Sequence, residues 1–369
     1  RLTSKKLLAS TLRSLTSSGP APRLYYLGTA KVFTLDPAGA APTTLIDNSP
    51  ADGSRGPGFN DGIAVHASTG QIFWTNMGVA AKRDGYVMRC EKDGSNVVTI
   101  VAPGGTFTPK QMKLDEASGK LYWSDREGMA IQRCNLDGSH LETLVVTGNP
   151  DTDKGDETRW CVGIALDPAR GHIYWTQKGG DNAGQGLIRR MNMQAPAGSS
   201  PTNRRDMVTL FSRMPEPIDL DLDLATRTMY WTDTKAHTIY AFDFEPATGE
   251  IGGQRVFARF PLKQDGQSLD SYGGRPDGAA VDAEGCYWVA MFEGQRLLRL
   301  SPTGEVLREV KLPVRCATMP CFGGADLKTI YITTSREKRP AAELMAQPMA
   351  GCVLALEVDV PGLPVNFAT

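Results

Sequence analysis

The sequence of 369 residues carries a net charge of −1 at pH 7 and 22% charged residues, so nothing favours a nucleic-acid or membrane-surface partner. Its 39 glycines and 24 prolines are typical of an all-β chain with many turns. No apolar run approaches the ~18 residues of a membrane span. The seven scattered cysteines favour free, mostly buried thiols and a cytoplasmic protein. The chain starts at Arg1 rather than at a methionine, which leaves a removed leader possible.

Residues 1–20 are rich in Ser, Lys and Leu and are predicted to form a peripheral arm. Residues 21–369 are predicted to form a single domain. Residues 30–36 read as a strand that has no tryptophan-bearing strand before it.

An aromatic strand then recurs along the chain. Its copies are Phe-Trp-Thr-Asn at 73–76, Tyr-Trp-Ser-Asp at 122–125, Tyr-Trp-Thr-Gln at 174–177, Tyr-Trp-Thr-Asp at 230–233 and Tyr-Trp-Val-Ala at 287–290. A weaker sixth copy is Tyr-Ile-Thr-Thr at 331–334. The tryptophans lie 49 to 57 residues apart, a period that fits one four-stranded blade of a β-propeller.

Each copy follows a continuously apolar strand, such as residues 163–167 or 278–282, and precedes an alternating strand such as residues 128–138. The apolar strands fit the innermost position of a blade. We expect the five motif tryptophans to pack between neighbouring blades. We also expect residues 30–36 to pair with residues 351–359, which closes an all-β, six-bladed β-propeller of four-stranded blades.

The motif at 122–125 and 230–233 resembles the YWTD propellers of lipoprotein receptors. From residue 275 to 362 the chain is similar to the SMP-30/gluconolactonase/LRE family, on Arg-Pro-Asp-Gly at 275–278 and Cys-Phe-Gly-Gly at 321–324. That resemblance implies Asp277 as a ligand of a divalent metal, Ca or Zn. The family's Asn turn is replaced here by Glu-Pro-Ile-Asp at 216–219, and no matching Glu precedes the first blade. Phe-Asn-Asp-Gly at 59–62 matches a substrate-binding motif of the family.

In general build the chain also resembles metal-independent propellers that act as hetero-Diels–Alderases in fungal tropolone–sesquiterpene biosynthesis. The incomplete ligand set agrees with that resemblance, which implies an enzyme without a cofactor.

Propeller sites form where loops lead into the innermost strands. The residues at these positions make up the expected site. Lys110, Glu216, Arg275 and Asp277 are the candidate catalytic residues, and Asn60, Asp61, Gln111, Trp160 and Tyr272 are the candidate substrate-binding residues.

Glu216 is open to two interpretations, a positioned acid or base, or a partner of Arg213 or Lys110. Asp277 could equally be a turn former, and the four histidines fit turn residues.

The sequence leaves three functions open. The first is a cofactor-free cyclase of secondary metabolism that joins a tropolone quinone methide to an apolar terpene alkene, because orientation of two reactants suffices for such a reaction. The second is a metal-dependent, gluconolactonase-like hydrolase, with Ca or Zn at Asp277. The third is a non-catalytic binding propeller. The first two imply a small-molecule substrate, and the oligomeric state is left open.

Overall fold

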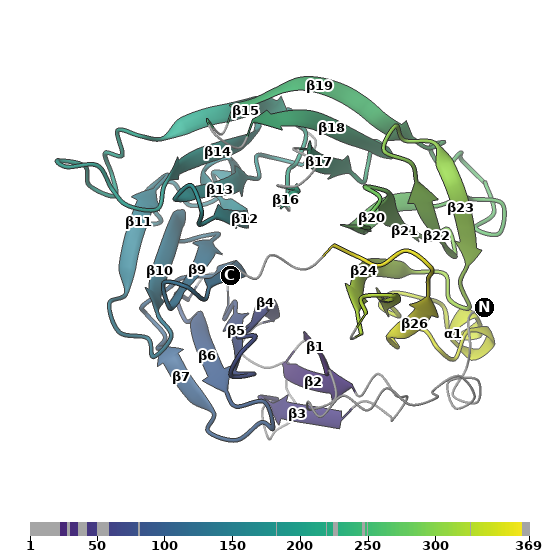
Figure 1. The fold of residues 1–369 in the computed structure, drawn as a ribbon, viewed down its shortest axis with the longest axis horizontal. Helices are drawn as coiled ribbons and strands as arrows, with labels where there is room; N and C mark the ends of the chain where they lie inside the picture. The colour runs from purple at the N-terminus through teal and green to yellow at the C-terminus, as the bar shows by residue number, and fades with distance from the viewer. Residues whose placement is uncertain are drawn as a thin grey trace.

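The described residues form seven antiparallel sheets arranged around a central axis (Figure 1). The computed structural model describes residues 23–27, 30–35, 43–49, 59–79, 82–181, 183–218, 220–223, 228–245, 248, 250–324 and 326–363. The β-propeller is therefore confirmed, whereas the expectation of six blades is wrong. The predicted arm at residues 1–20 lies outside the described residues.

The first four sheets contain fifteen strands in chain order. They are β1 (Leu24–Leu27), β2 (Lys31–Leu35) and β3 (Thr43–Asp47); β4 (Asn60–Val65), β5 (Ile72–Asn76), β6 (Tyr86–Cys90) and β7 (Val98–Val101); β8 (Pro109–Asp115), β9 (Lys120–Asp125), β10 (Ala130–Asn135) and β11 (Glu142–Val146); and β12 (Cys161–Asp167), β13 (His172–Gln177), β14 (Gly186–Asn192) and β15 (Val208–Met214). The short 3-10 helix η1 (Glu157–Arg159) leads into β12.

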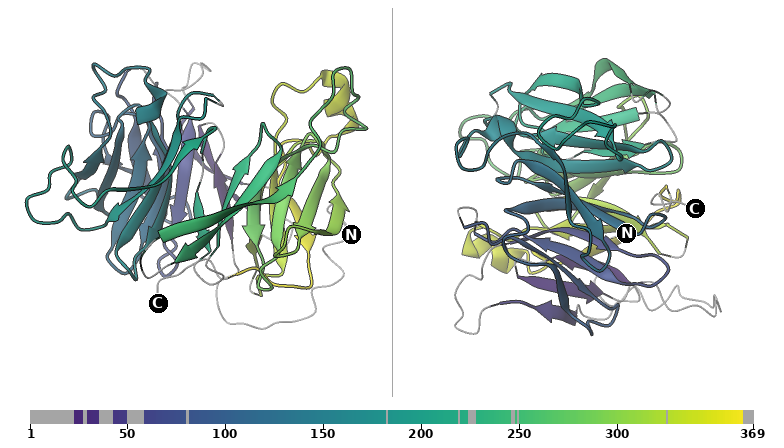
Figure 2. Two further views of the ribbon diagram at one scale, coloured as in Figure 1. Left: turned by 90° about the horizontal axis from the view of Figure 1, so that it is seen from above. Right: turned by 90° about the vertical axis from the view of Figure 1, so that its left-hand side faces the viewer.

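The last three sheets contain eleven strands. They are β16 (Asp221–Asp223), β17 (Thr228–Asp233), β18 (Thr238–Glu245) and β19 (Glu250–Arg259); β20 (Arg275–Val281), β21 (Tyr287–Phe292), β22 (Arg296–Leu300) and β23 (Val306–Lys311); and β24 (Ala317–Gly323), β25 (Thr329–Thr334) and β26 (Leu354–Glu357). Helix α1 (Ala341–Ala346) lies between β25 and β26 in the chain and beyond the strand ends of the last sheet (Figure 2). No described helix is both long and apolar enough to cross a membrane.

The predicted closure of the ring is also wrong. Strand β2 pairs with β1 (residues 24–27) on one side and with β3 (residues 43–47) on the other. These three strands form an additional sheet. Among the described strands, β26 pairs with β25. The short connections of a local meander make these pairings cheaper in chain entropy than a contact between the two ends of the chain.

The segment after β26 instead returns to the sixth sheet. Gly362 forms an isolated bridge with Asp282, and the Ala283 amide donates to the Pro361 carbonyl at 2.8 Å. The Gly362 amide donates to Leu327 of the seventh sheet at 2.9 Å. This segment therefore joins the last two sheets to each other.

The motif tryptophans pack between sheets, as predicted. Trp123 is fully buried and shares a cluster with Phe73 and Val87 of the preceding sheet. The same arrangement holds for Trp74, Trp175 and Trp231. The residue before each tryptophan points to the opposite face, so Tyr122 packs against the following sheet. All seven cysteines are free, and five of them are buried, as expected.

The sixth sheet departs from this pattern by one residue. Trp288 packs with Ile332 and Leu354 of the following sheet, while Tyr287 packs with Ile239 of the preceding one. Trp288 pairs with Ala280 across the β20–β21 hairpin, one residue later than the register of the other sheets. A one-residue change of register exchanges the two faces of a strand. The copy at 287–290 is thus aligned in sequence but not in space.

Replacement of Trp123 or Trp231 by alanine should lower the free energy of unfolding by about 3 to 5 kcal/mol, because each substitution leaves a large cavity between two sheets. Trp160→Ala is the matched control. Trp160 is partly exposed and lies outside these clusters, so its loss should cost about 1 kcal/mol or less. Denaturant unfolding measures both, and equal costs for Trp123→Ala and Trp160→Ala would contradict the packing role.

Candidate functional site

The inner strands share a β-bulge near their first residues. In β4 the register shifts between Asn60 and Ile63, so Asp61 and Gly62 oppose a single residue of β5. The same shift occurs in four other described inner strands. The bulged pairs are Asp61-Gly62, Lys110-Gln111, Val162-Gly163, Asp277-Gly278 and Thr318-Met319. Antiparallel pairing brings all five bulges to the same end of the ring.

In the second, third and fourth sheets a hydroxyl opposite the bulge contacts the inner strands. The Thr75 hydroxyl accepts from the Gly62 amide at 2.8 Å and donates to the Lys110 carbonyl of the next sheet at 2.7 Å. Thr176 repeats this arrangement with Gly163 and Ile218. Ser124 likewise donates to the Val162 carbonyl. The third residue of the Tyr-Trp-Thr-Asp motif therefore fixes the position of the bulges.

The sixth sheet lacks this hydroxyl. Ala290 is the residue opposite the bulge formed by Asp277 and Gly278, since the register places Pro276 against Met291 and Ala279 against Val289. A methyl group cannot accept the bulge amide or donate to a carbonyl. Val289, the third residue of this motif copy, has no hydroxyl either, so the sequence rather than the change of register leaves this bulge without one.

Asp61 and Lys110 form a closed pair. The Lys110 ammonium donates to the Asp61 carboxylate across the second and third sheets, and the two side chains are 16% and 21% exposed. Asn60 accepts a hydrogen bond from the Asn76 amide at 2.9 Å. Gln111 is half-buried beside Lys110. These four predicted residues lie together at the second and third sheets.

Trp160 lies between two cations. The Arg126 guanidinium carbon is 5.1 Å from the centre of the Trp160 ring, and the Lys178 ammonium is 5.8 Å from it. Its indole N–H is buried without a hydrogen-bond partner among the described residues. Cations near the ring face contribute about 0.5 to 1 kcal/mol each at exposed sites. The aromatic surface predicted for a ligand thus already contacts protein.

Glu216 belongs to an ion-pair cluster. Its carboxylate lies 3.3 Å from both the Lys178 and the Lys235 ammonium groups. Burial opposes the charge of Lys178, yet hydrogen bonds to Asp181, Glu157 and Glu216 raise its pKa above the ordinary value. The ion-pair interpretation of Glu216 is therefore the one observed, but its partners are neither Arg213 nor Lys110.

Arg275 and Tyr272 face a second ionic network. The Arg275 guanidinium lies 3.2 Å from Glu293 and stacks 4.8 Å from the Phe292 ring centre. Tyr272 is buried, its hydroxyl lies 3.0 Å from His237 Nε2, and burial raises its pKa. Tyr272 is thus a packing residue behind the inner strand.

Asp277 is in a different state from the other predicted residues. Within the part of the chain that the structure describes, its carboxylate has no hydrogen bond or ion pair. Burial raises its pKa to about 6, and the field of Arg275 only partly opposes this shift. The side chain remains partly reached by solvent. A desolvated, unpaired and accessible carboxylate of this kind is typical of functional sites.

The residues around Asp277 do not make up a metal site on their own. Among the described residues, no group of three His, Cys, Asp or Glu side chains lies close enough to hold an ion. Divalent ions of the Ca or Zn type need several such ligands. Asp219, from the segment that replaces the family's Asn turn, lies outside the described residues. The described side chains around Asp277 therefore do not supply the ligand set of such an ion.

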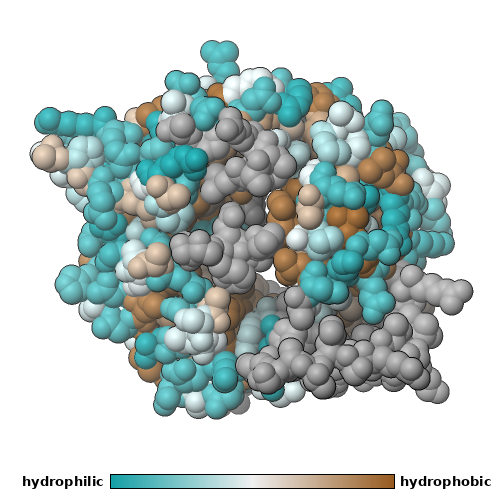
Figure 3. All heavy atoms as spheres, in the orientation of Figure 1, coloured by the Kyte–Doolittle hydropathy of each residue, from teal (hydrophilic) through white to brown (hydrophobic). Residues whose placement is uncertain are grey.

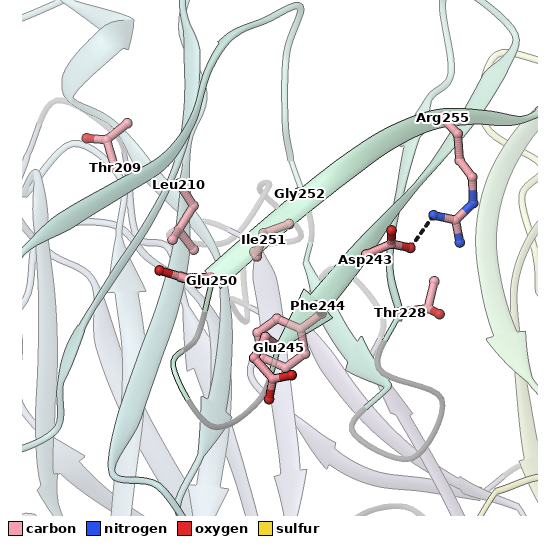
Figure 4. Close-up of a pocket in the computed structure, with 10 residues that line it drawn as sticks. All are labelled: Thr209, Leu210, Thr228, Asp243, Phe244, Glu245, Glu250, Ile251, Gly252 and Arg255. Carbon is pink, nitrogen blue, oxygen red and sulfur yellow. Dashed lines mark hydrogen bonds and ion pairs between the residues drawn. The ribbon is translucent and has the colours of Figure 1, made fainter.

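A separate hollow of about 860 Å³ lies far from the bulges, on the outer strands of the fourth and fifth sheets (Figure 4). It is lined by Leu210, Phe244 and Ile251 and by the exposed ion pair of Asp243 with Arg255, whose atoms are 2.6 Å apart. This ion pair satisfies both charges. The hollow brings none of the predicted site residues together.

Comparisons with known proteins place the chain in a family. A protein of Pyricularia oryzae named Low-density lipoprotein receptor-related protein 1 is 36% identical over 313 residues, which cover 78% of this chain and 97% of that protein. The chain belongs to the family of this fungal protein. Its residues 218–336 match the SMP-30/Gluconolactonase/LRE-like region, so this similarity begins earlier than the expected residue 275.

Two further relatives connect this region to named proteins. The 6-deoxy-6-sulfogluconolactonase of Pseudomonas putida is 50% identical over 137 residues, which cover 36% of this chain and 43% of that enzyme. The crystal structure of regucalcin from Agrobacterium tumefaciens, described as a calcium-binding protein, aligns with a TM-score of 0.55 at 20% identity and covers 82% of this chain and 91% of that one. The structural likeness supports the propeller fold.

The raised pKa of Asp277 predicts how stability depends on pH. The unfolded chain releases this proton near the ordinary value of 3.8, and the folded chain retains it until about pH 6. Stability is therefore lost as pH rises through this window, by on the order of 2 to 3 kcal/mol. Asp277→Asn removes the loss, so the variant should unfold at a higher temperature than the parent at pH 7.5 but not at pH 4.

Asp243→Asn, on the outer surface, serves as the control and should show no such gain at either pH. Thermal unfolding followed by circular dichroism decides the question. An Asp277→Asn variant that is less stable than the parent at pH 7.5 would mean that the carboxylate is paired.

Proposed function

We propose that this protein hydrolyses lactones at the end of the ring where the bulges of the inner strands meet. The observation that carries the proposal is the unpaired, desolvated carboxylate of Asp277 in the Pro-Asp-Gly bulge of β20. The similarity of residues 218–336 to the SMP-30/gluconolactonase/LRE-like region supports it. The identity with a lactonase of Pseudomonas putida supports the same reaction class.

In this proposal Asp277 is the general base. With a pKa of about 6 it is ionised at neutral pH and accepts a proton from a water molecule. The water oxygen attacks the lactone carbonyl carbon, and the ring C–O bond then breaks. The proton passes from Asp277 to the departing ring oxygen, which leaves a hydroxy acid. Arg275, whose field acts on Asp277, is the described cation best placed to stabilise the negative charge on the carbonyl oxygen.

The relatives support hydrolysis rather than the cycloaddition expected from general build. One of the relatives reported above is named a lactonase, and none of those relatives has a name that refers to a cyclase. The site also has an ionisable base, which a pericyclic reaction does not require. Lactone hydrolysis, which the sequence suggested in a metal-dependent form, is therefore the function proposed.

The test is a lactone-hydrolysis assay by pH-stat. The value of kcat/KM should rise with pH through about 6, because only the ionised base is active. Asp277→Asn should lower kcat/KM by about 100-fold or more, and Arg275→Ala should chiefly lower kcat. Asp243→Asn, on the outer surface, should retain the parental rate.

A chelator arm addresses the alternative in which Asp277 is one ligand of Ca or Zn. Activity that survives the chelator supports the direct base. Activity that appears only after Ca or Zn is added contradicts the direct base and points to a ligand role. Parental activity of Asp277→Asn, or no turnover of any lactone, would contradict the proposal as a whole.

A further inference from the structure

Three large hydrophobic side chains are exposed at inner positions of the ring. They are Phe59, immediately before β4, Ile218, before β16, and Met319, in the bulge of β24, with exposed fractions of 51%, 43% and 42%. Of the other exposed hydrophobic residues that the structure describes, half lie on outer strands, such as Val256 of β19 and Val306 of β23. Exposed apolar groups at inner positions are therefore a distinct set.

Two of the three, Ile218 and Met319, belong to the sheets on either side of the one that carries Asp277. The Thr176 hydroxyl lies 3.4 Å from the Ile218 carbonyl, in the same role that Thr75 has towards Lys110, so Ile218 occupies the bulge position of the fifth sheet. Asp277 occupies that position in the sixth sheet. Met319 belongs to the bulge of the seventh sheet. Ile218 and Asp277 thus hold the first bulge position of two consecutive sheets, and Met319 holds the second bulge position of the sheet that follows.

Met319 lies directly against the strand that carries Asp277. A Cβ atom built on Gly278 would be 2.6 Å from the Met319 sulfur and 2.7 Å from the Thr318 carbonyl oxygen. Such distances leave room only for a glycine, which is why the inner strands approach so closely here. The Thr318 hydroxyl bonds to Thr333 at 2.7 Å. The seventh sheet therefore presents the Met319 side chain, with its thioether, to the site rather than an open polar group.

Three of the charged groups at this end of the ring already have ion-pair partners. Lys110 is paired with Asp61, Arg275 with Glu293, and Glu216 with Lys178. Figure 3 shows the other end of the ring, where the segment after β26 lies, and there the periphery is mainly hydrophilic. A polyhydroxylated ligand would lose hydration against Ile218 and Met319 without replacement hydrogen bonds. Transfer of an alkyl group from water to these apolar side chains would be favourable, because it removes apolar surface from water.

We infer that the substrate is a lactone with a hydrophobic substituent, whose ester group lies at Asp277 and whose apolar part contacts Ile218 and Met319. This inference rests on the proposed lactonase function and specifies its substrate class. It distinguishes this site from one that binds a sugar lactone, because each buried hydroxyl of a sugar needs a polar partner.

The experiment compares three lactones of one ring size: δ-gluconolactone, δ-valerolactone, which has no substituent, and δ-decalactone, which carries a pentyl chain. We expect kcat/KM for δ-decalactone to exceed that for δ-valerolactone by about tenfold or more, with δ-gluconolactone below both. Met319→Ala and Ile218→Ala should each lower kcat/KM for δ-decalactone by about three- to tenfold and change that for δ-valerolactone by less than about twofold.

Met345→Ala is the matched control, because Met345 is a 78% exposed methionine on α1 outside the bulges. It should leave the three values unchanged. A preference for δ-gluconolactone, or equal losses on all three lactones in Met319→Ala, would overturn the inference and leave the lactonase function standing. Failure to turn over any of the three would overturn the proposed function and the inference with it.

Discussion

The structure depends on the burial of aromatic side chains between sheets. A single antiparallel sheet cannot bury both of its faces, so each sheet must pack against two neighbours around the ring. Adjacent residues of a strand point to opposite faces, and a Tyr-Trp pair therefore supplies both contacts from one strand. Tyr122 and Trp123 do this for the third sheet, each in a different cluster. The closed arrangement of the sheets follows from the repetition of this pair.

Close packing of the sheets brings the inner strands together at their bulges. Gly62 and Gly278 mark the closest approaches, because a Cβ atom on either would overlap the carbonyl oxygen of the next inner strand. Each glycine follows an aspartate, yet the two aspartates end in opposite states. Asp61 is neutralised by Lys110, while Asp277 has no ion-pair partner among the described residues and faces Ala290, which has no hydroxyl, opposite its bulge. One local structure thus yields a structural ion pair in one sheet and a reactive carboxylate in another.

Much of the fold could be predicted, because the aromatic strand repeats with its inner neighbour and alternating partner. The tryptophan packing and the set of inner-strand positions follow from that repeat. The additional sheet could not be predicted, since β1 and β3 carry no copy of the motif. The reversed faces of Tyr287 and Trp288 depend on the register of one hairpin, which the motif does not encode.

The positions of the candidate site residues could be predicted better than their ionic interactions. Repeat register brought Asp61, Lys110 and Asp277 into the expected set, and these three do lie at equivalent bulges. Their charges depend on neighbours elsewhere in the chain, as for Glu216, whose partners Lys178 and Lys235 lie in the loops that follow β13 and β17. Ile218 and Met319 were missed, although their positions beside the bulges could have been found by aligning the hydroxyl residue of each motif.

The central claim is that Asp277 is an unpaired carboxylate whose desolvation holds its proton to near-neutral pH. The most direct measurement is the pH titration of its side-chain carboxyl by ¹³C NMR on protein labelled at aspartate, with the resonance assigned by its absence in Asp277→Asn. The account predicts a midpoint at about pH 6. A midpoint near or below the ordinary value of 3.8 would show that the carboxylate is solvated or paired, and would contradict the account.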